Sequence, residues 1–517
     1  MHRAARLPAW AITAACALAW LLVNPPTPDL AAHEYRAEIA RRIGFGIWEQ
    51  GWYGGHHLPG YSVLMPPLAA LLSPQVVAAL AVVAATWCFA RLAGAHWPAP
   101  AARAATLVFA VGVVSTLVGG QLAFAAGLAP ALGALVAARS GRAALGAVLG
   151  ALTTLTSPVA AAFLVLAATA WFVTDRPPAA VWVAVGAVVP GLAIIVAFSD
   201  GGVQPFSGSS FLWSFAVAVA VVLAAPRVAR TLKLGAALYA LTLLAGVAVD
   251  NPLGSNLVRL AAVFGPPVIA GSLWDRRMRV LVVAALPLLY WQWLAPVRSV
   301  IRGARDRSSE RRYHAPLIAE LARREALQGP FRTEVPFTSN HWETRFVAPD
   351  HPLARGWERQ LDVQFNPLFY DRGALTAASY RRWLDRMAVA YVALPDIELD
   401  PAGAAEGRLV ASGSVPGLVG VWHSRNWRLY RVTGARPLAE PPVRVTRLGV
   451  DDVALTTPRP AAVTVRVRFS PYWAIDRGDC VARAPGGWTR VRLGHAGPAR
   501  LRIAFALSRI GASGPRC

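Results

Sequence analysis

The chain has 517 residues, of which 55% are hydrophobic and 15% charged, and its formal net charge is +23 at pH 7. It is too apolar for an ordinary soluble protein and long enough for more than one domain. Lys233 is the only lysine, so arginine carries the positive charge. This charge predicts contact with anionic membrane lipids. Nucleic acid would be an odd partner, because most of the arginines lie after residue 297, in a part of the chain that is predicted below to be extracytoplasmic. The alternative is that an arginine- and alanine-rich genome produces such surfaces without a specific partner.

Hydrophobicity divides the sequence into a membrane half and a soluble half. Residues 8 to about 296 form a series of apolar runs, whereas residues 297–517 are mixed and charged. A span needs about 20 apolar residues, fewer where protein shelters it, so the runs predict about eleven spans. The predicted spans are 8–24, 74–93, 101–118, 121–138, 142–156, 158–173, 179–198, 211–225, 234–249, 256–273 and 278–295. The stretch YSVLMPPLAALL (61–72) is either re-entrant or an early part of the second span.

The basic residues indicate how these spans are oriented. With the N-terminus inside, the inside loops contain arginines and Lys233, whereas the outer turns GGQ, TSP, SDGGVQPFSGSS and DNPLGSN contain neither arginine nor lysine. This pattern predicts a multi-pass protein of a bacterial plasma membrane with a cytoplasmic N-terminus. Residues 25–60 and 297–517 are then extracytoplasmic. The first run lacks a small-residue cleavage site, so we expect a signal anchor.

The segment TPDLAAHEYRAEI (27–39) concentrates ionisable residues directly after the first run. It contains Asp29, His33, Glu34 and Glu38, whereas no acid before residue 297 lies in the middle of a predicted span. Ion-driven carriers usually need ionisable groups at bilayer depth, so a site at the outer surface is favoured. The segment predicts a helix along the membrane surface. Alternatively, Asp29 only caps this helix and the remaining polar residues are solvated.

Two further stretches place aromatic or polar residues at the outer ends of predicted spans. GIWEQGWYGGHHLPGYSVLMPPLAALL (46–72) is rich in aromatic residues, which suit either the membrane interface or stacking on sugar rings. DNPLGSNLVRL (250–260) places Asn251, Asn256 and Arg259 at the outer start of a span, where backbone N–H groups also favour anions. The alternative for Arg259 is that it reaches the interface or pairs with Asp250.

The order of these parts resembles the C-type (GT-C) superfamily of membrane glycosyltransferases. The resemblance rests on Asp29, LAAHEYRAEIARR and HHLPGYSVLMPPLAALL, and it covers the topology of residues 1–296 and the placing of a C-terminal outer domain. It implies a polyprenyl-phosphate sugar donor and an acidic general base in the first outer loop. The family's usual acidic pair is absent, because Leu30 follows Asp29. HHLPGYSVL, NPLGSNLVRL and ARGWERQLD also resemble a group of actinobacterial multi-span proteins.

These observations predict the members of the site. Asp29 is the first candidate for the general base, which takes the proton of the acceptor hydroxyl, and Glu34 is the second. The residues expected to hold the donor phosphate are Arg259, Asn256 and Asn251. The residues expected to contact sugar or acceptor are His33, His56, His57, Trp52, Tyr53 and Tyr61. A divalent metal on Asp29 and His33 is an alternative, although adjacent histidines such as 56 and 57 rarely bind one ion together.

The soluble half is predicted to contain two extracytoplasmic subdomains, α/β over 297–440 and a small β-sandwich over 441–517. YHAPLIAELARRE and ASYRRWLDRMA predict helices, whereas VAYVALP and NWRLYRV predict strands. AAVTVRVRFS, WTRVRLG and ARLRIAFAL alternate as sandwich strands do. GWERQLD with FNPLFYD suits carbohydrate contact or a packed turn. Cys480 and Cys517 can form a disulfide if they are close, whereas Cys16 and Cys88 are apolar residues of spans.

Three functions remain compatible with the sequence. The favoured one is transfer of a sugar from a polyprenyl-phosphate donor to a glycan or lipid acceptor of the cell envelope. A transporter or flippase of envelope lipids is the second, and it would need polar, water-lined spans. A non-catalytic envelope-assembly protein that binds glycan through its outer domain is the third, and for that role Asp29 would be dispensable.

Overall fold

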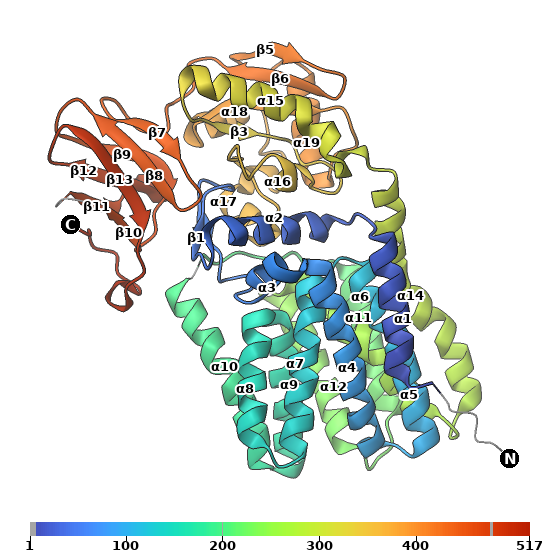
Figure 1. The fold of residues 1–517 in the computed structure, drawn as a ribbon. Helices are drawn as coiled ribbons and strands as arrows, with labels where there is room; N and C mark the ends of the chain where they lie inside the picture. Colours follow the sequence, from blue (N-terminus) through green and yellow to red (C-terminus); the bar gives the residue numbers. More distant parts are fainter. Residues whose placement is uncertain (1–6, 199, 476–478) are drawn as a thin grey trace. The chain divides into compact units, whose positions relative to one another are not determined.

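The computed structural model describes residues 7–198, 200–475 and 479–517 (Figure 1). The chain forms two compact units. Unit 1 comprises residues 1–33, 61–195 and 203–304, and unit 2 comprises residues 34–60, 196–202 and 305–517. Each unit is therefore built from segments that are discontinuous in the sequence.

Unit 1 is helical. Its helices are α1 (Ala9–Val23), α3 (Met65–Leu72), α4 (Pro74–His96), α5 (Ala99–Gly112), α6 (Val114–Val118), α7 (Leu122–Arg139), α8 (Ala143–Thr156), α9 (Pro158–Asp175), α11 (Gly208–Ala224), α12 (Arg230–Ala248), η1 (Gly254–Leu257), α13 (Val258–Leu273) and α14 (Met278–Ala304). Two more helices, α2 (Pro28–Ile43) and α10 (Pro178–Ala197), contribute residues to both units.

The apolar runs are helices, but fewer than the eleven expected are long and apolar enough to cross a membrane within the described residues. Within the described residues, eight are long and apolar enough to cross a membrane, namely α4, α5 with α6, α7, α9, α10, α12, η1 with α13, and α14. Helices α8 and α11 are shorter, and α1 forms with α2 a pair bent by 81°. The chain is a multi-pass membrane protein, and the number of eleven spans is not confirmed.

Short polar turns set the ends of several of these helices. Ser157 accepts a hydrogen bond from the backbone N–H of Ala160 and is followed by Pro158 in the first turn of α9. Ser73 caps α4 before Pro74 in the same way. A serine cap followed by proline starts a helix, because the cap satisfies a free N–H and proline lacks one. The TSP turn therefore separates α8 from α9.

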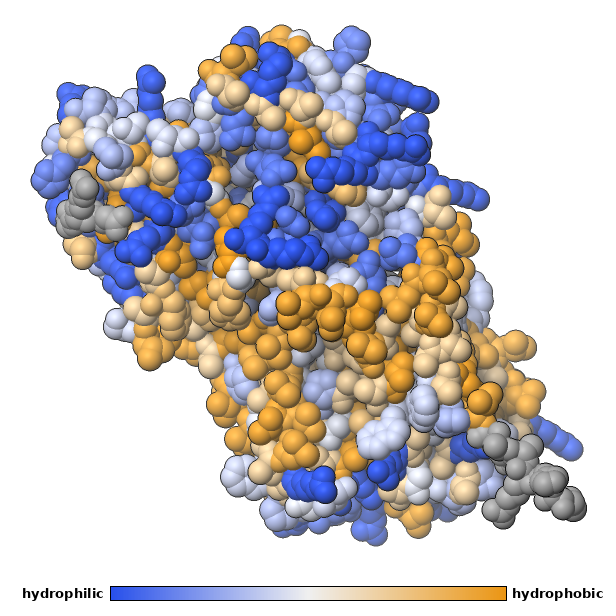
Figure 2. All heavy atoms as spheres, viewed as in Figure 1, coloured by the Kyte–Doolittle hydropathy of each residue, from blue (hydrophilic) through white to orange (hydrophobic). Residues whose placement is uncertain are grey.

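The surfaces of the two units differ in polarity. Leu192, Ile195, Leu223 and Leu286 of α10, α11 and α14 are exposed apolar side chains. Apolar side chains dominate the visible surface of the helical unit in Figure 2, whereas polar side chains dominate that of unit 2. An apolar exterior is what a helix bundle in lipid requires, because hydrocarbon cannot solvate polar side chains. The backbone hydrogen bonds of such a bundle are made within the helices.

The first part of unit 2 is a mixed sheet with helices. Its sheet has the order β3-β4-β6-β5, with β3 parallel to β4 and the other pairs antiparallel. The strands are β3 (Arg332–Glu334), β4 (Val389–Pro395), β5 (Leu418–His423) and β6 (Trp427–Val432). The helices are α15 (Arg311–Gln328), α16 (Glu343–Phe346), α17 (Arg359–Phe365), α18 (Ala377–Arg386) and α19 (Pro401–Ala411). Tyr380 and Trp383 of α18 pack with Val392 of β4 in one core.

The second part of unit 2 consists of two antiparallel sheets, β10-β13-β8-β7 and β11-β12-β9. The strands are β7 (Arg444–Leu448), β8 (Asp452–Thr457), β9 (Ala461–Arg468), β10 (Trp473–Ile475), β11 (Cys480–Arg483), β12 (Trp488–Leu493) and β13 (Gly497–Ile503). Val453, Val465, Val491 and Leu501 share one core, as in a β-sandwich. Cys480 and Cys517 form a disulfide.

A small hairpin of the first loop completes this sandwich core. Strands β1 (Trp48–Glu49) and β2 (His56–His57) are antiparallel. Trp48 belongs to the core of the sandwich, and its ring centroid lies 5.7 Å from that of Trp473. Unit 2 therefore contains residues that come before most of the membrane helices in the sequence.

A buried ionic network lies in the α/β part of unit 2. Arg355 donates to Asp362 at 2.7 Å and to Glu406 at 2.8 Å, and all three side chains are fully buried. Tyr370 donates to Asp362 at 2.6 Å, and Tyr380 donates to Glu406 at 2.8 Å. Asp362 of GWERQLD and Tyr370 of FNPLFYD thus belong to a packed network around Arg355, whereas Trp357, Arg359 and Asp371 of the same stretches stay at least partly exposed.

Glu334 of β3 is a buried acid beside this network. Burial, and then the charge of Glu406, raise the pKa of Glu334 well above its usual value. The folded protein therefore keeps a proton on Glu334 that the unfolded chain releases above a pKa of about 4.3. The stability that this proton contributes is fully present below a pH of about 4.3 and is lost as the pH rises toward the pKa of Glu334 in the folded protein.

We expect Glu334→Gln to remove this pH dependence and to raise the thermal unfolding temperature at neutral pH. The measurement is thermal unfolding of the detergent-solubilised full chain at about pH 5 and about pH 8. The loss of stability between the two values should be smaller for Glu334→Gln than for the wild type. The exposed acid Glu310 offers the control, and Glu310→Gln should keep the wild-type difference. If Glu334→Gln lost as much stability between the two pH values as the wild type, the raised pKa of Glu334 would not be the cause of that loss.

Candidate functional site

Asp29 lies in the first turn of α2 and is half-buried within unit 1. The GGQ turn approaches it closely, because Gly120 has a φ of +76° and no side chain. A Cβ atom at Gly120 would lie 3.1 Å from the Cβ atom of Asp29 and would collide with the hydroxyl of Thr27. Glycine is therefore required at position 120, both for its backbone conformation and for the close contact.

Arg259 lies in the first turn of α13, also in unit 1, and its guanidinium carbon is 5.5 Å from the ring centroid of Phe124. It is close enough to Asp29 and to Tyr61 to interact with both electrostatically. The structure thus brings together one predicted catalytic acid, one predicted phosphate-binding cation and a tyrosine. These three residues come from α2, α13 and the loop before α3.

Tyr61 is held by its own loop and by a neighbouring histidine. The ring centroids of Tyr61 and His33 are 5.9 Å apart. The next residue, Ser62, donates its hydroxyl to the carbonyl of Thr156 at 2.7 Å. The backbone N–H groups of Val63 and Leu64 donate to the carbonyl of Leu155. The loop before α3 is therefore fixed to the turn between α8 and α9.

The two predicted asparagines differ in what they can offer to a phosphate. The side-chain oxygen of Asn251 accepts hydrogen bonds from the backbone N–H groups of Leu253 and Gly254, and its amide donates to the carbonyls of Gly246 and Val249. Asn251 thus stabilises the turn before η1. Because its side-chain oxygen and amide both bond the backbone, the structure does not support a role for Asn251 in phosphate binding. Asn256 is half-buried in η1, one turn before Arg259.

Glu34 has a different environment from Asp29. It is assigned to unit 2, where its carboxylate pairs with Arg345 at 3.2 Å. The two acids are five residues apart and therefore face different sides of α2. Glu34 thus lies in the soluble unit, whereas Asp29 lies in the membrane unit near Arg259.

His56, Trp52 and Tyr53 are buried in unit 2 rather than displayed on its surface. His56 lies 2.9 Å from Glu49 and 3.9 Å from Glu358. Burial alone lowers the pKa of His56, but the facing carboxylates outweigh this effect, and the pKa is raised. The Trp52 ring stacks on His56, with the centroids 5.6 Å apart. Such burial does not support the expected contacts of these three residues with a sugar.

His57 belongs to a chain of hydrogen bonds that the sequence does not reveal. Its Nδ1 atom is 2.7 Å from Asp200, and its Nε2 atom is 3.0 Å from the hydroxyl of Ser470. Burial raises the pKa of Asp200, but the contacts with His57 outweigh this and lower it. The order Asp, His, Ser is that of a hydrolase triad. Ser470 is fully buried, however, so the chain ties three segments of unit 2 together rather than presenting a nucleophile.

Metal ligation was an alternative for Asp29 and His33. Within residues 7–198, 200–475 and 479–517, no group of three or more His, Cys, Asp or Glu side chains could hold a metal ion.

No family model matches this sequence, and no curated protein does. Among solved structures, the cryo-EM structure of the arabinofuranosyltransferase AftD from mycobacteria is similar, with a TM-score of 0.51 and 15% identity. The match covers 98% of this chain and 58% of AftD. The R1389S mutant of AftD gives a TM-score of 0.47, also at 15% identity, over 98% of this chain and 60% of that one.

The fold is therefore similar to that of the arabinofuranosyltransferase AftD. The chain spans little more than half the length of AftD.

Proposed function

We propose that this protein is a GT-C glycosyltransferase that moves a sugar from a polyprenyl-phosphate donor to an acceptor hydroxyl. The observation that carries the proposal is the placement of Asp29 and Arg259 within electrostatic reach of each other in the membrane unit. A carboxylate and a guanidinium are the two charged groups that the reaction needs. The similarity in fold to AftD supports the same class of chemistry.

The two residues have complementary roles. The oxygen of the acceptor hydroxyl attacks the anomeric carbon of the sugar, and the Asp29 carboxylate takes the proton of that hydroxyl. The bond between that carbon and the phosphate oxygen breaks, and the phosphate leaves with the electron pair. Arg259 stabilises the negative charge of the departing lipid phosphate through charge-assisted hydrogen bonds. A cation in a membrane helix is costly unless it binds an anion, which a lipid phosphate supplies.

The orientation and the substrates follow from the same proposal. On the topology predicted from the basic loops, Asp29 faces the extracytoplasmic side, where a glycan or lipid of the cell envelope is the acceptor. The soluble unit would then be extracytoplasmic. AftD is an arabinofuranosyltransferase, so a polyprenyl-phosphate arabinofuranose is the first donor to test, followed by other lipid-linked sugars.

Removal of Arg259 should weaken donor binding. We expect Arg259→Ala to lower the polyprenyl phosphate that copurifies with the protein by about tenfold or more, since a charge-assisted hydrogen bond contributes about 1.5–3 kcal/mol. The measurement is mass spectrometry of lipids retained by the detergent-purified full chain. Arg298→Ala, an exposed arginine of α14, is the matched control and should retain the wild-type amount.

Equal retention in Arg259→Ala and the wild type would contradict the role of Arg259. A lipid flippase, the second candidate function, would also retain the polyprenyl lipid. It would differ from a glycosyltransferase by showing no sugar transfer that depends on Asp29.

A further inference from the structure

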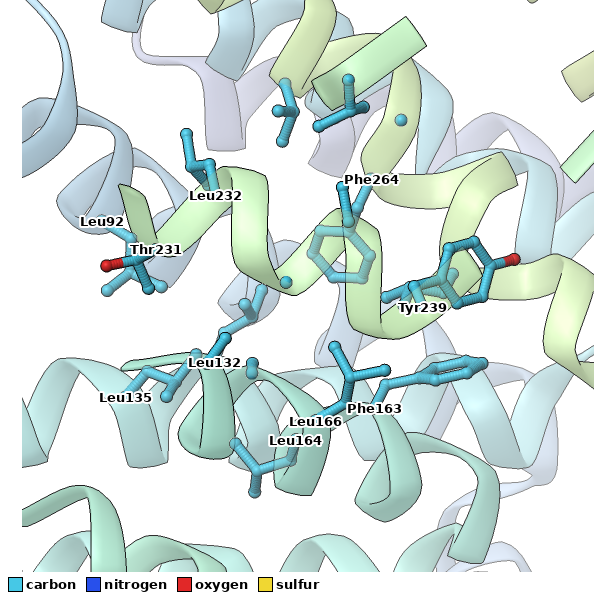
Figure 3. Close-up of a pocket in the computed structure, with 18 of the residues that line it drawn as sticks. Leu92, Leu132, Leu135, Phe163, Leu164, Leu166, Thr231, Leu232, Tyr239 and Phe264 are labelled. Atoms are coloured by element: carbon cyan, nitrogen blue, oxygen red, sulfur yellow. The ribbon is translucent and has the colours of Figure 1, made fainter. Parts of the chain in front are cut away.

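A cavity of about 290 Å³ lies within unit 1, among α4, α7, α9, α11, α12 and α13 (Figure 3). Its walls are almost entirely apolar, with Leu132, Phe163 and Phe264 among the lining side chains. An empty apolar cavity forfeits dispersion contacts on all its walls, and water gains few hydrogen bonds there. A hydrocarbon chain is the occupant that suits such walls.

The polar groups of the lining lie at the two ends of the cavity. In Figure 3 the hydroxyls of Thr231 and Tyr239 lie toward opposite ends. The Tyr239 hydroxyl is already used, because it donates to the carbonyl of Leu257 at 2.7 Å. That end therefore offers a ligand no free hydroxyl proton from Tyr239.

The charged end of the cavity is formed by the ends of three helices. Arg139 ends α7 and His96 ends α4, and the two interact electrostatically. Thr231 begins α12 and bonds Thr174 of α9 at 2.7 Å. Arg139 lies over the ring of Trp171, with its guanidinium carbon 5.9 Å from the centroid. Arg139 and His96 are both exposed and also line the cavity, so a group outside can reach them.

We infer that this cavity binds an acyl chain of one anionic phospholipid, whose phosphate contacts Arg139 and His96. The apolar walls select the chain, and the Arg139 guanidinium selects the charge of the head group. On the topology predicted from the basic loops, this end faces the cytoplasmic leaflet. The inference goes beyond the proposed function, in which Arg259 rather than Arg139 holds a lipid phosphate.

The test is quantitative mass spectrometry of phospholipids that copurify with the full chain in mild detergent. Arg139→Gln removes the charge, and Gly235→Leu places a side chain at a lining position where an added Cβ meets only Ala170, at 3.6 Å. Each variant should lower the retained anionic phospholipid by about tenfold, as expected for losing one charge-assisted contact or the bound chain. Gel filtration reports whether each variant is folded.

The chain offers matched controls for both variants. Arg91 lies over the ring of Trp87 as Arg139 lies over Trp171, but it is not part of the lining, so Arg91→Gln should retain the wild-type amount. Gly94 of α4 has open space around it, so Gly94→Leu is the control for Gly235→Leu. If Gly235→Leu does not fold, Arg139→Gln still decides the question, because Arg139 is exposed.

Two results would overturn the inference. One is retention of anionic phospholipid that equals the wild type in folded Arg139→Gln and Gly235→Leu. The other is that Gly235→Leu loses polyprenyl phosphate but keeps phospholipid, which would make the cavity the place of the donor chain. Arg259→Ala distinguishes this inference from the proposed function, because it should lose polyprenyl phosphate and keep the phospholipid.

Discussion

Replacement of Asp29 by asparagine should reduce sugar transfer by about 10²–10⁴-fold, the usual contribution of a positioned general base. Asparagine keeps the shape of the side chain but cannot take the proton of the acceptor. The retained polyprenyl lipid should stay at the wild-type level, because Arg259 still binds the phosphate. The measurement is transfer from a radiolabelled polyprenyl-phosphate sugar to acceptors in envelope membranes, with lipid retention measured on the same preparation.

Glu34→Gln is the matched control for Asp29→Asn, because both acids lie on α2 and Glu34 pairs with Arg345. We expect Glu34→Gln to transfer sugar at close to the wild-type rate. The reverse result, with transfer lost in Glu34→Gln and kept in Asp29→Asn, would move the role of base to Glu34. Transfer by both variants at the wild-type rate would remove the general base from the proposal.

Replacement of Arg355 by methionine should destabilise unit 2 by about 3–5 kcal/mol, as breaking a buried ion pair does. Arg355 forms ion pairs with both Asp362 and Glu406 in the core of unit 2. Its loss leaves two buried carboxylates without their counter-charge. Unfolding of the purified full chain by urea, followed through tryptophan fluorescence, measures the effect, because Trp383 lies in the same part of unit 2.

A surface ion pair provides the comparison. Arg312 pairs with Glu310, and both side chains are largely exposed, so Arg312→Ala should leave the unfolding transition unchanged. If Arg355→Met unfolds at the same urea concentration as Arg312→Ala, the network around Arg355 contributes no net stability, and the prediction is wrong.

The helices and strands could be predicted because their signals are local. A run such as 158–173 identifies α9, since a backbone in lipid must satisfy its hydrogen bonds within the helix. VAYVALP coincides with β4, where alternation and β-branched residues are typical of strands. The number of spans was harder to predict, because α8, with 14 residues, and α11, with 17 residues, are apolar but short for a membrane span.

The site could be predicted only in part. Asp29 and Arg259 could be proposed because each is a charged residue next to an apolar run; the structure brings them within electrostatic reach, and their roles stay predictions. The roles of His56 and His57 could not be predicted from the sequence, because their partners Glu358, Asp200 and Ser470 are far away along the chain. No periodic pattern reports such distant contacts. The burial of Asp362 had no local signal either, since a packed turn and a carbohydrate site use the same residue types.

The hairpin of β1 and β2 has a consequence for the order in which the protein folds. Arg468 donates a hydrogen bond to the carbonyl of Tyr53 across 415 residues of sequence. At a synthesis rate of about 5–20 residues per second, the partners of this early loop appear about 20–80 seconds later. During that interval Trp48 and Trp52 lack the core that later covers them. A ribosome that stalls after the last membrane helix therefore leaves a chain whose early aromatic loop is open to proteases and chaperones.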